Sequence, residues 1–238
     1  MAITQQALDF LFENRLHDSR DWFLAHRAEY EALVKRPAEE LAAALAPAAL
    51  AVDPLLATQP SRAVSRIRRD TRFTRDKSLY RDRVWIAFAR PNPAEERRAR
   101  EELPCFYLEF SSDGSCGWGC GFYAPSPAYL ETLRAQVRAR TPSWQAAAAA
   151  LAAHPQLVLD GTRYKRPRFA DAPADERPWL ELRSLFVHRV HPAPQLLFSD
   201  RLAAAASADF AALAPLYDFL LEVWSLRRTE LVFPPALQ

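Results

Sequence analysis

The chain has 238 residues, of which 50% are hydrophobic, 25% charged and 11% aromatic, a composition typical of a globular protein with a buried core. The formal net charge is only +2, from 31 basic and 29 acidic residues, which argues against a general nucleic-acid coat. No stretch reaches the roughly 18 consecutive apolar residues of a membrane helix, and the first residues do not form a secretory signal, so we expect a cytoplasmic protein that does not enter a membrane.

The first 50 residues are expected to be helical. Apolar residues recur at helical spacing over residues 4–35, with Thr4 as the cap and a break near residues 17–19. Asp18 or Ser19 is suited to cap the second helix. Pro37 is then expected to open a further helical run, because proline suits a first helical turn.

Three strands are predicted in the middle of the chain. Residues 84–89 and 105–111 are rich in β-branched and aromatic residues, and the second run alternates, with Phe106, Leu108 and Phe110 on one face. A turn with Asp113-Gly114 at its tip leads to a return strand over residues 116–123.

The return strand is rich in glycine. The chain has five glycines, and four of them lie within residues 114–121. Gly117, Gly119 and Gly121 alternate, so they would strip one face of the strand of side chains. Such a face permits close approach by a helix, another backbone or a ligand.

The second half of the chain returns to helices with two further strand regions. The pattern predicts helices over 126–140, capped by Ser126, over 143–153, and over 207–228, with a kink or junction at Pro215. A shorter helix is expected to start at Pro178. The predicted strands are one before and one short one after a turn at Asp160-Gly161, and another over 185–190. We therefore predict an α+β fold: one domain over residues 1–238, with a mostly antiparallel sheet and helices at both chain ends packed on it.

A basic motif stands out at residues 66–83, "RIRRDTRFTRDKSLYRDR". Its 18 residues hold eight Lys or Arg and three Asp, a net charge of +5, so the rest of the chain sums to −3. The positive charge is therefore local, which favours a site for a small or local anion.

Two hypotheses for this motif stay open. In the first, guanidinium groups bind a phosphorylated or otherwise anionic small molecule, because their planar donors match phosphate and carboxylate. In the second, the motif is an internal Arg–Asp network in a non-catalytic interaction module. Nucleic acid, with Phe73 and Tyr80 stacking on bases, is a third and weaker reading. The candidate anion site comprises Arg66, Arg68, Asp70, Arg72, Asp76, Lys77, Gly117, Gly119 and Gly121, with the aspartates orienting the arginines and the glycines giving room.

The same motif resembles the signature of the DUF2461 family of conserved hypothetical bacterial proteins, whose pattern runs close to R-I-x-R-D-x-R-F-S-K-D-K-x-P-Y-K. Three other segments agree in order: "DSRDWF", "GWGCGFYAPSP" and "LDGTRYKRPRF". The likeness extends over roughly residues 8–225. It implies an α+β bacterial cytoplasmic protein and carries no particular activity with it.

The chain departs from the family pattern at a few positions. Leu79 replaces a usual proline, and His17-Asp18 stands where an Asn pair is common. Phe169 replaces an expected glycine, and Arg177 replaces a frequent histidine. If the Asn pair or the histidine has a function in the family, that function is altered here.

No other motif identifies a reaction, a cofactor or an oligomeric state. The glycines do not open a helix as a dinucleotide fingerprint does, and no P-loop or zinc motif is present. His188 and His191 form a weak metal pair, since no acidic residue stands near them at ligand spacing. Residues 164–168, "YKRPR", form a second basic patch.

Overall fold

The prediction of an α+β fold is confirmed by a computed structural model, which describes residues 3–72, 74–91, 103–122, 125–189, 192 and 194–232. Within these residues an antiparallel five-stranded sheet has the order β1-β2-β3-β5-β4, with helices from both ends of the chain packed against it. The strands are β1 (Arg83–Ala89), β2 (Cys105–Ser111), β3 (Cys116–Phe122), β4 (Leu157–Asp160) and β5 (Leu185–Arg189).

The chain groups into two compact units. The first comprises Met1–Phe88, Tyr107–Trp118 and His191–Ala208, and the second Ala89–Phe106, Gly119–Val190 and Asp209–Gln238. The expectation of a single domain over residues 1–238 stays a prediction.

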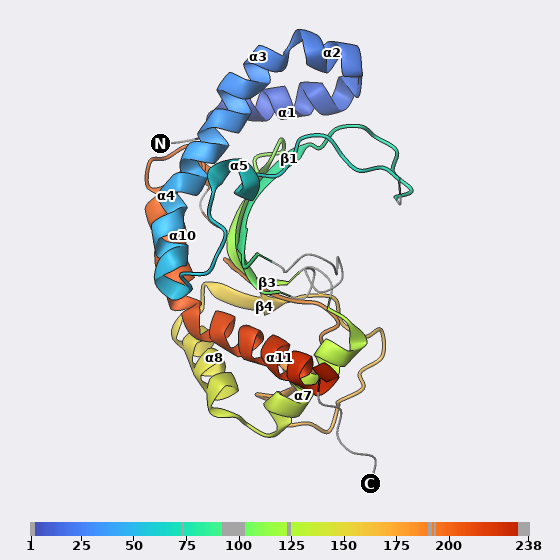
Figure 1. Cartoon of the computed structure of the whole chain (residues 1–238), viewed down its shortest axis with the longest axis vertical. Helices are drawn as coiled ribbons and strands as arrows, with labels where there is room; N and C mark the ends of the chain where they lie inside the picture. Colours follow the sequence, from blue (N-terminus) through green and yellow to red (C-terminus); the bar gives the residue numbers. More distant parts are fainter. Residues whose placement is uncertain are drawn as a thin grey trace. The chain divides into compact units, whose positions relative to one another are not determined.

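Helices dominate the start of the first unit, and Figure 1 shows α1 running beside α3. The Thr4 hydroxyl caps the first helix by accepting the Ala7 N–H, as predicted. Of the two candidates for the next cap, Ser19 serves, while Asp18 ends the preceding helix in the left-handed conformation at φ 44°. The helical segments are α1 (Gln5–His17), α2 (Arg20–Ala25), α3 (Arg27–Tyr30), the π-helical η1 (Glu31–Lys35), α4 (Arg36–Val52) and α5 (Pro60–Ala63).

The expectation that Pro37 opens a further helical run is only partly correct. Pro37 lies in the first turn of α4, but helical backbone runs into it without a gap through the π turn. Pro37 has no N–H, so it cannot satisfy the carbonyl four residues before it. Here the Arg36 N–H donates to the Glu31 carbonyl five residues back, which widens the helix by one residue rather than ending it.

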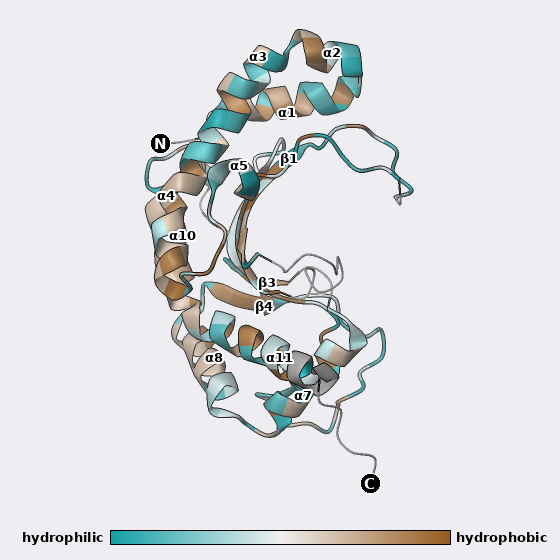
Figure 2. Ribbon diagram, in the orientation of Figure 1, coloured by the Kyte–Doolittle hydropathy of each residue, from teal (hydrophilic) through white to brown (hydrophobic). Residues whose placement is uncertain are grey.

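The second unit is built around α11 (Ala214–Val232), which contacts both α7 (Pro127–Arg138) and α8 (Pro142–Ala153), as Figure 1 shows. Buried aromatic side chains fill the space between these elements. Phe106 of β2 contacts Phe210 and Tyr217 at centroid distances of 4.9 and 5.1 Å, and the Tyr129 hydroxyl donates to the Leu220 carbonyl at 2.7 Å. Figure 2 shows β4 as a hydrophobic strand, and β4 contacts α8. The second unit also holds α9 (Arg177–Leu180), whereas η2 (Pro194–Leu196) and most of α10 (Leu202–Ala212) belong to the first unit.

One predicted strand is wrong. The residues after Gly161 form a loop, with a single isolated bridge between Arg163 and Leu182. At the start of the predicted strand the Thr162 N–H donates to the Ser184 hydroxyl at 2.8 Å, and just beyond it the Glu181 carboxylate accepts the backbone N–H groups of Arg168 and Phe169 at 2.8 and 2.7 Å. Side chains rather than a strand partner therefore bind these amides.

The other predicted elements occur within a few residues of their expected bounds. Ser126 caps α7, and Pro215 opens α11 after a junction with α10, which begins earlier than predicted. The ends of the predicted strands at Tyr123 and Val190 lie outside the described residues. No single helix in the described part of the chain is long and apolar enough to span a membrane, although Leu202–Ala212 and Ala214–Arg227 meet that requirement together as a bent pair.

Candidate functional site

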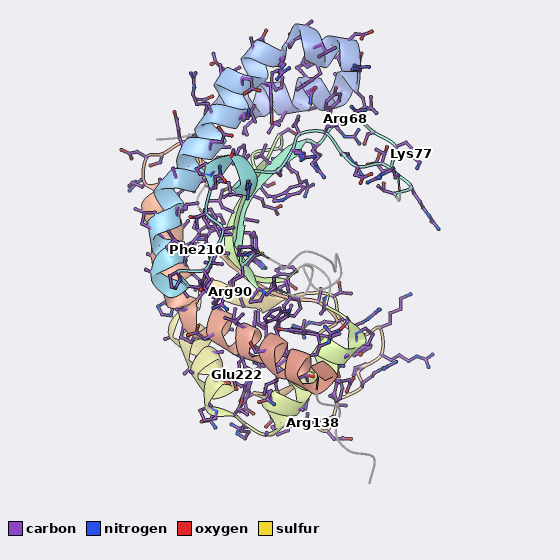
Figure 3. All side chains as sticks on the ribbon, viewed as in Figure 1. Arg68, Lys77, Arg90, Arg138, Phe210 and Glu222 are labelled. Carbon is purple, nitrogen blue, oxygen red and sulfur yellow. The ribbon has the colours of Figure 1, made fainter. Side chains whose placement is uncertain are left out.

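The basic motif forms a hairpin within the first unit. Val64 bridges Ile86 and Arg68 bridges Tyr80 in antiparallel register, and the Ser65 N–H donates to the Trp85 carbonyl at 2.8 Å. Residues 64–69 therefore run beside the segment that becomes β1, and residues 70–72 and 74–78 belong to the loop. We name residues 64–86 the arginine hairpin. Figure 3 shows Arg68 near the base of the loop and Lys77 near its far end.

Within the loop, Arg69 belongs to a hydrogen-bonded network. Its guanidinium donates to the Asp76 carboxylate and, at 3.0 Å, to the Ser78 hydroxyl. Ser78 in turn donates to Asp76 Oδ1 through its hydroxyl at 2.6 Å and its backbone N–H at 3.0 Å. These bonds from Ser78, with the Arg69 guanidinium, hold the pKa of Asp76 well below its usual range. Asp76 therefore acts as an ionised structural acceptor.

Two cations of the candidate site, Arg72 and Lys77, also have partners inside the loop. The Arg72 guanidinium binds Asp70 with two parallel hydrogen bonds of 3.0 and 2.7 Å, a bidentate pair. The Lys77 ammonium donates to the Thr71 carbonyl at 2.9 Å. For these residues the geometry is that of an internal network.

Arg81 positions the other arm of the hairpin. Its Nη1 donates to the carbonyl oxygens of Arg66 and Arg68, the latter at 2.9 Å, and its guanidinium lies over the Trp85 ring at 4.5 Å from the centroid. These bonds fix the backbone of residues 66–68, so the side chains of Arg66 and Arg68 project from a fixed backbone.

Arg66 and Arg68 differ from their neighbours. Both are exposed, and among the described residues neither guanidinium has a hydrogen-bond or ion-pair partner. Ile67 between them is 6% exposed, so the alternation of an extended segment turns the two arginines outward together. The hairpin is hydrophilic along most of the loop in Figure 2.

A groove of about 580 Å³ lies against these two side chains. This volume is in the range of small-molecule sites. The lining includes four of the candidate residues, Arg66, Arg68, Asp70 and Arg72, and five that the sequence did not single out as site residues, Ser65, Arg69, Thr71, Arg81 and Trp85. Asp76 and Lys77 are not among the lining residues.

Additional positive charge lies near the hairpin. Burial raises the pKa of Tyr80, whereas the charges of Arg68 and Arg20 act to lower it, so both guanidinium groups are near the phenol. Arg20 is exposed and stands at the start of α2.

Stacking of Tyr80 on a base is not compatible with its place in the core, where it is 3% exposed and stacks on Phe23. Phe73 lies outside the described residues.

The glycines of the candidate site have a different place. A Cβ on Gly119 would lie 1.8 Å from the Val187 carbonyl oxygen, and one on Gly121 would lie 2.5 Å from that of Leu185. Close approach of the β5 backbone therefore requires both glycines. A Cβ on Gly117 would meet nothing within 4 Å. None of the three lines the groove.

No metal centre is found in the part of the chain that the structure describes, where no group of three or more His, Cys, Asp or Glu could hold an ion. His188 Nδ1 lies 4.0 Å from the Asp160 carboxylate. Its proposed metal partner His191 lies outside the described residues.

The fold and the site together define an α+β protein in which an arginine-rich hairpin is joined to an antiparallel sheet. The chain belongs to the family described as conserved hypothetical protein (DUF2461), whose model matches residues 6–219. No curated protein and no solved structure matches the chain.

Proposed function

We propose that this DUF2461 protein binds a phosphorylated or otherwise anionic small molecule in the groove of the arginine hairpin, with Arg66 and Arg68 as the anion ligands. The observation that carries the proposal is the contrast within one motif. Arg69, Arg72 and Lys77 have acceptors inside the loop, whereas the guanidinium groups of Arg66 and Arg68 have none among the described residues and border the groove.

The physical argument concerns two like charges held close together. Arg66 and Arg68 are two positions apart on an extended segment, so their stems point the same way and their cations repel. A phosphate or carboxylate between them replaces repulsion by charge-assisted hydrogen bonds. Ser65 and Thr71, which also line the groove, add hydroxyl groups that suit a polar ligand.

The alternative is a non-catalytic interaction module in which the motif serves only as an Arg–Asp network. The pairs Arg69–Asp76 and Arg72–Asp70 favour it for three of the nine residues of the candidate site. The two functions make different demands on Arg66 and Arg68, because a scaffold does not need them.

A thermal-shift screen separates the two. The probes are inorganic phosphate, sulfate, a hexose phosphate, AMP and a short oligothymidylate, each at low and high salt. A ligand at a hundredfold excess over its Kd stabilises the fold by about 2.7 kcal/mol, a shift of several degrees. We expect Arg66→Gln/Arg68→Gln to abolish that shift and to leave the melting temperature without ligand nearly unchanged.

Arg75→Gln is the matched control. Arg75 is exposed on the same loop, has no partner among the described residues and does not line the groove. The substitution therefore removes only a nearby charge. If Arg75→Gln loses the ligand-induced shift in melting temperature to the same extent, general electrostatics rather than a specific site causes that shift. If none of the small anions raises the melting temperature of wild type, the binding proposal is wrong and the motif serves as the Arg–Asp network.

A further inference from the structure

A second concentration of positive charge lies in the second unit, independent of the arginine hairpin. The loop "TRYKRPRF", residues 162–169, holds four cations and no acidic residue. Because the whole chain carries only +2, all other residues together sum to −2. Lys165, Arg166 and Arg168 are exposed, and their side chains have no partner with a carboxylate in the described part of the chain.

Aromatic rings hold several of the guanidinium groups in place. The Cζ atoms of Arg168 and Arg183 lie 4.2 and 5.8 Å from the centroid of Tyr164, so the two cations are at most about 10 Å apart. On the neighbouring ring, Arg138 Cζ lies 5.2 Å from the Phe169 centroid. Arg138 lies on α7 and is labelled in Figure 3. Stacked guanidinium groups lose less freedom when they bind a planar anion.

Internal bonds also fix the loop itself. Glu181 is 7% exposed, and its Oε1 accepts both the Arg168 and the Phe169 backbone N–H. The Tyr164 hydroxyl accepts a hydrogen bond of 3.0 Å from Arg134, a buried arginine that is 3% exposed. The positions from which the exposed cations project are therefore set before any partner arrives.

Nearby carboxylates do not neutralise these cations. Glu181 is used by the backbone, and Asp175 and Glu176 both bind Arg140, at 2.7 and 2.8 Å. Asp171 is exposed and has no hydrogen bond or ion pair among the described residues. Arg168 and Arg183 are therefore exposed cations that an anion from outside can bind.

We propose that this surface, the Tyr164 patch, formed by Arg138, Lys165, Arg166, Arg168 and Arg183, docks a short acidic segment of a partner protein. Two observations favour acidic protein over nucleic acid. Guanidinium groups already lie against the Tyr164 and Phe169 rings, so these rings offer poor platforms for base stacking. The charge is also local, and a long polyanion would meet a slightly acidic protein beyond the patch.

Fluorescence anisotropy with a labelled octaglutamate peptide and the full chain tests the proposal. We expect saturable binding that weakens with salt, and about tenfold weaker binding for Arg168→Gln/Arg183→Gln, since two exposed charged contacts are lost. Arg36→Gln/Arg62→Gln is the matched control, because it removes two exposed arginines that have no ion pair in the described residues and lie outside the patch. It should change the affinity less than twofold.

Three results would overturn the proposal: no saturable binding of octaglutamate, equal weakening in the two double variants, or tighter binding of labelled octathymidylate than of octaglutamate. The last would assign the patch to nucleic acid. Circular dichroism and the melting temperature of both double variants verify that each is folded. Arg66→Gln/Arg68→Gln separates this site from the arginine hairpin, because octaglutamate bound at the Tyr164 patch should keep its affinity in that variant; the two proposals then stand or fall separately.

Discussion

Asp18 Oδ1 accepts the backbone N–H of Leu79 at 2.7 Å, across 61 positions of the sequence. The same oxygen accepts the N–H of Tyr80 at 3.1 Å. Asp18 ends α1 in the left-handed conformation, which aims its side chain at the base of the arginine hairpin. One short side chain therefore ends a helix and also fixes the arm of the hairpin that pairs with Arg68.

Replacing Asp18 tests this anchor. Asp18→Ala leaves two partly buried amides without an acceptor and places alanine in a left-handed conformation, so we expect a loss of about 2 kcal/mol in the free energy of unfolding. Asp18→Asn keeps an Oδ1 acceptor and tolerates the conformation, so its loss should be below about 1 kcal/mol. Urea unfolding measures both. Equal losses would show that the negative charge, not the acceptor, is what matters.

The role of Asp18 gives a physical reason for the Asn pair that is common in the family pattern at positions 17 and 18. An asparagine at position 18 can accept the same two N–H groups and adopts the same left-handed backbone. The replacement by Asp18 therefore preserves the anchor, and it does not by itself imply an altered function.

Acid should weaken the loop through Asp76. Its pKa is lower in the folded chain than in the unfolded one, so the ionised carboxylate favours the fold. That contribution is complete above the unfolded pKa of about 4 and is lost as the pH falls through the folded pKa. We expect wild type to melt above Asp76→Asn at pH 7, by a small amount because the group is exposed, and the difference to shrink below about pH 4.

Asp171→Asn is the control for this measurement, since it removes an exposed carboxylate that has no hydrogen bond among the described residues. It should show no comparable pH-dependent difference from wild type. A difference between wild type and Asp76→Asn that stays constant from pH 7 to the acid limit would contradict the assignment.

Local signals made much of the fold predictable. Ser19 and Ser126 cap helices with their own hydroxyls, and the alternation of Phe106, Leu108 and Phe110 places all three in the core. Such features need only neighbouring residues, so a pattern in the sequence reveals them. The loop after Gly161 was misjudged because its backbone N–H groups bind the side chains of Ser184 and Glu181, which no local pattern identifies.

The candidate site was less predictable for the same reason. The basic motif was visible at once, but the partner of each arginine depends on the register of the hairpin. That register pairs Arg69 with Asp76 and leaves Arg66 and Arg68 together on the groove. Trp85 was also missed, although its outward position on a strand with alternating burial is a signal that could have found it.

The cysteines should be unreactive in the native protein. Burial raises the pKa of Cys105 to about 11 and of Cys116 to about 12, and it raises that of Cys120 further above its usual value. Because the thiolate is the nucleophile, we expect each to react with a disulfide reagent at pH 8 at least about a hundredfold more slowly than free cysteine. All three should react readily in denaturant. One fast native thiol would show that a cysteine is available for chemistry.

The glycines of β3 offer the sharpest matched pair. A methyl group at Gly119 would lie 1.8 Å from the Val187 carbonyl oxygen, and that oxygen belongs to the sheet backbone, which cannot move without breaking strand pairing. We expect Gly119→Ala to cost more than about 3 kcal/mol or to prevent folding. Gly117→Ala meets open space and should change the free energy of unfolding by less than about 1 kcal/mol, with a gain expected because glycine is unfavourable in a strand. Urea unfolding of the two variants decides between close packing and a ligand as the reason for the glycines. If Gly119→Ala folds with wild-type stability, the approach of β5 is not what requires glycine there.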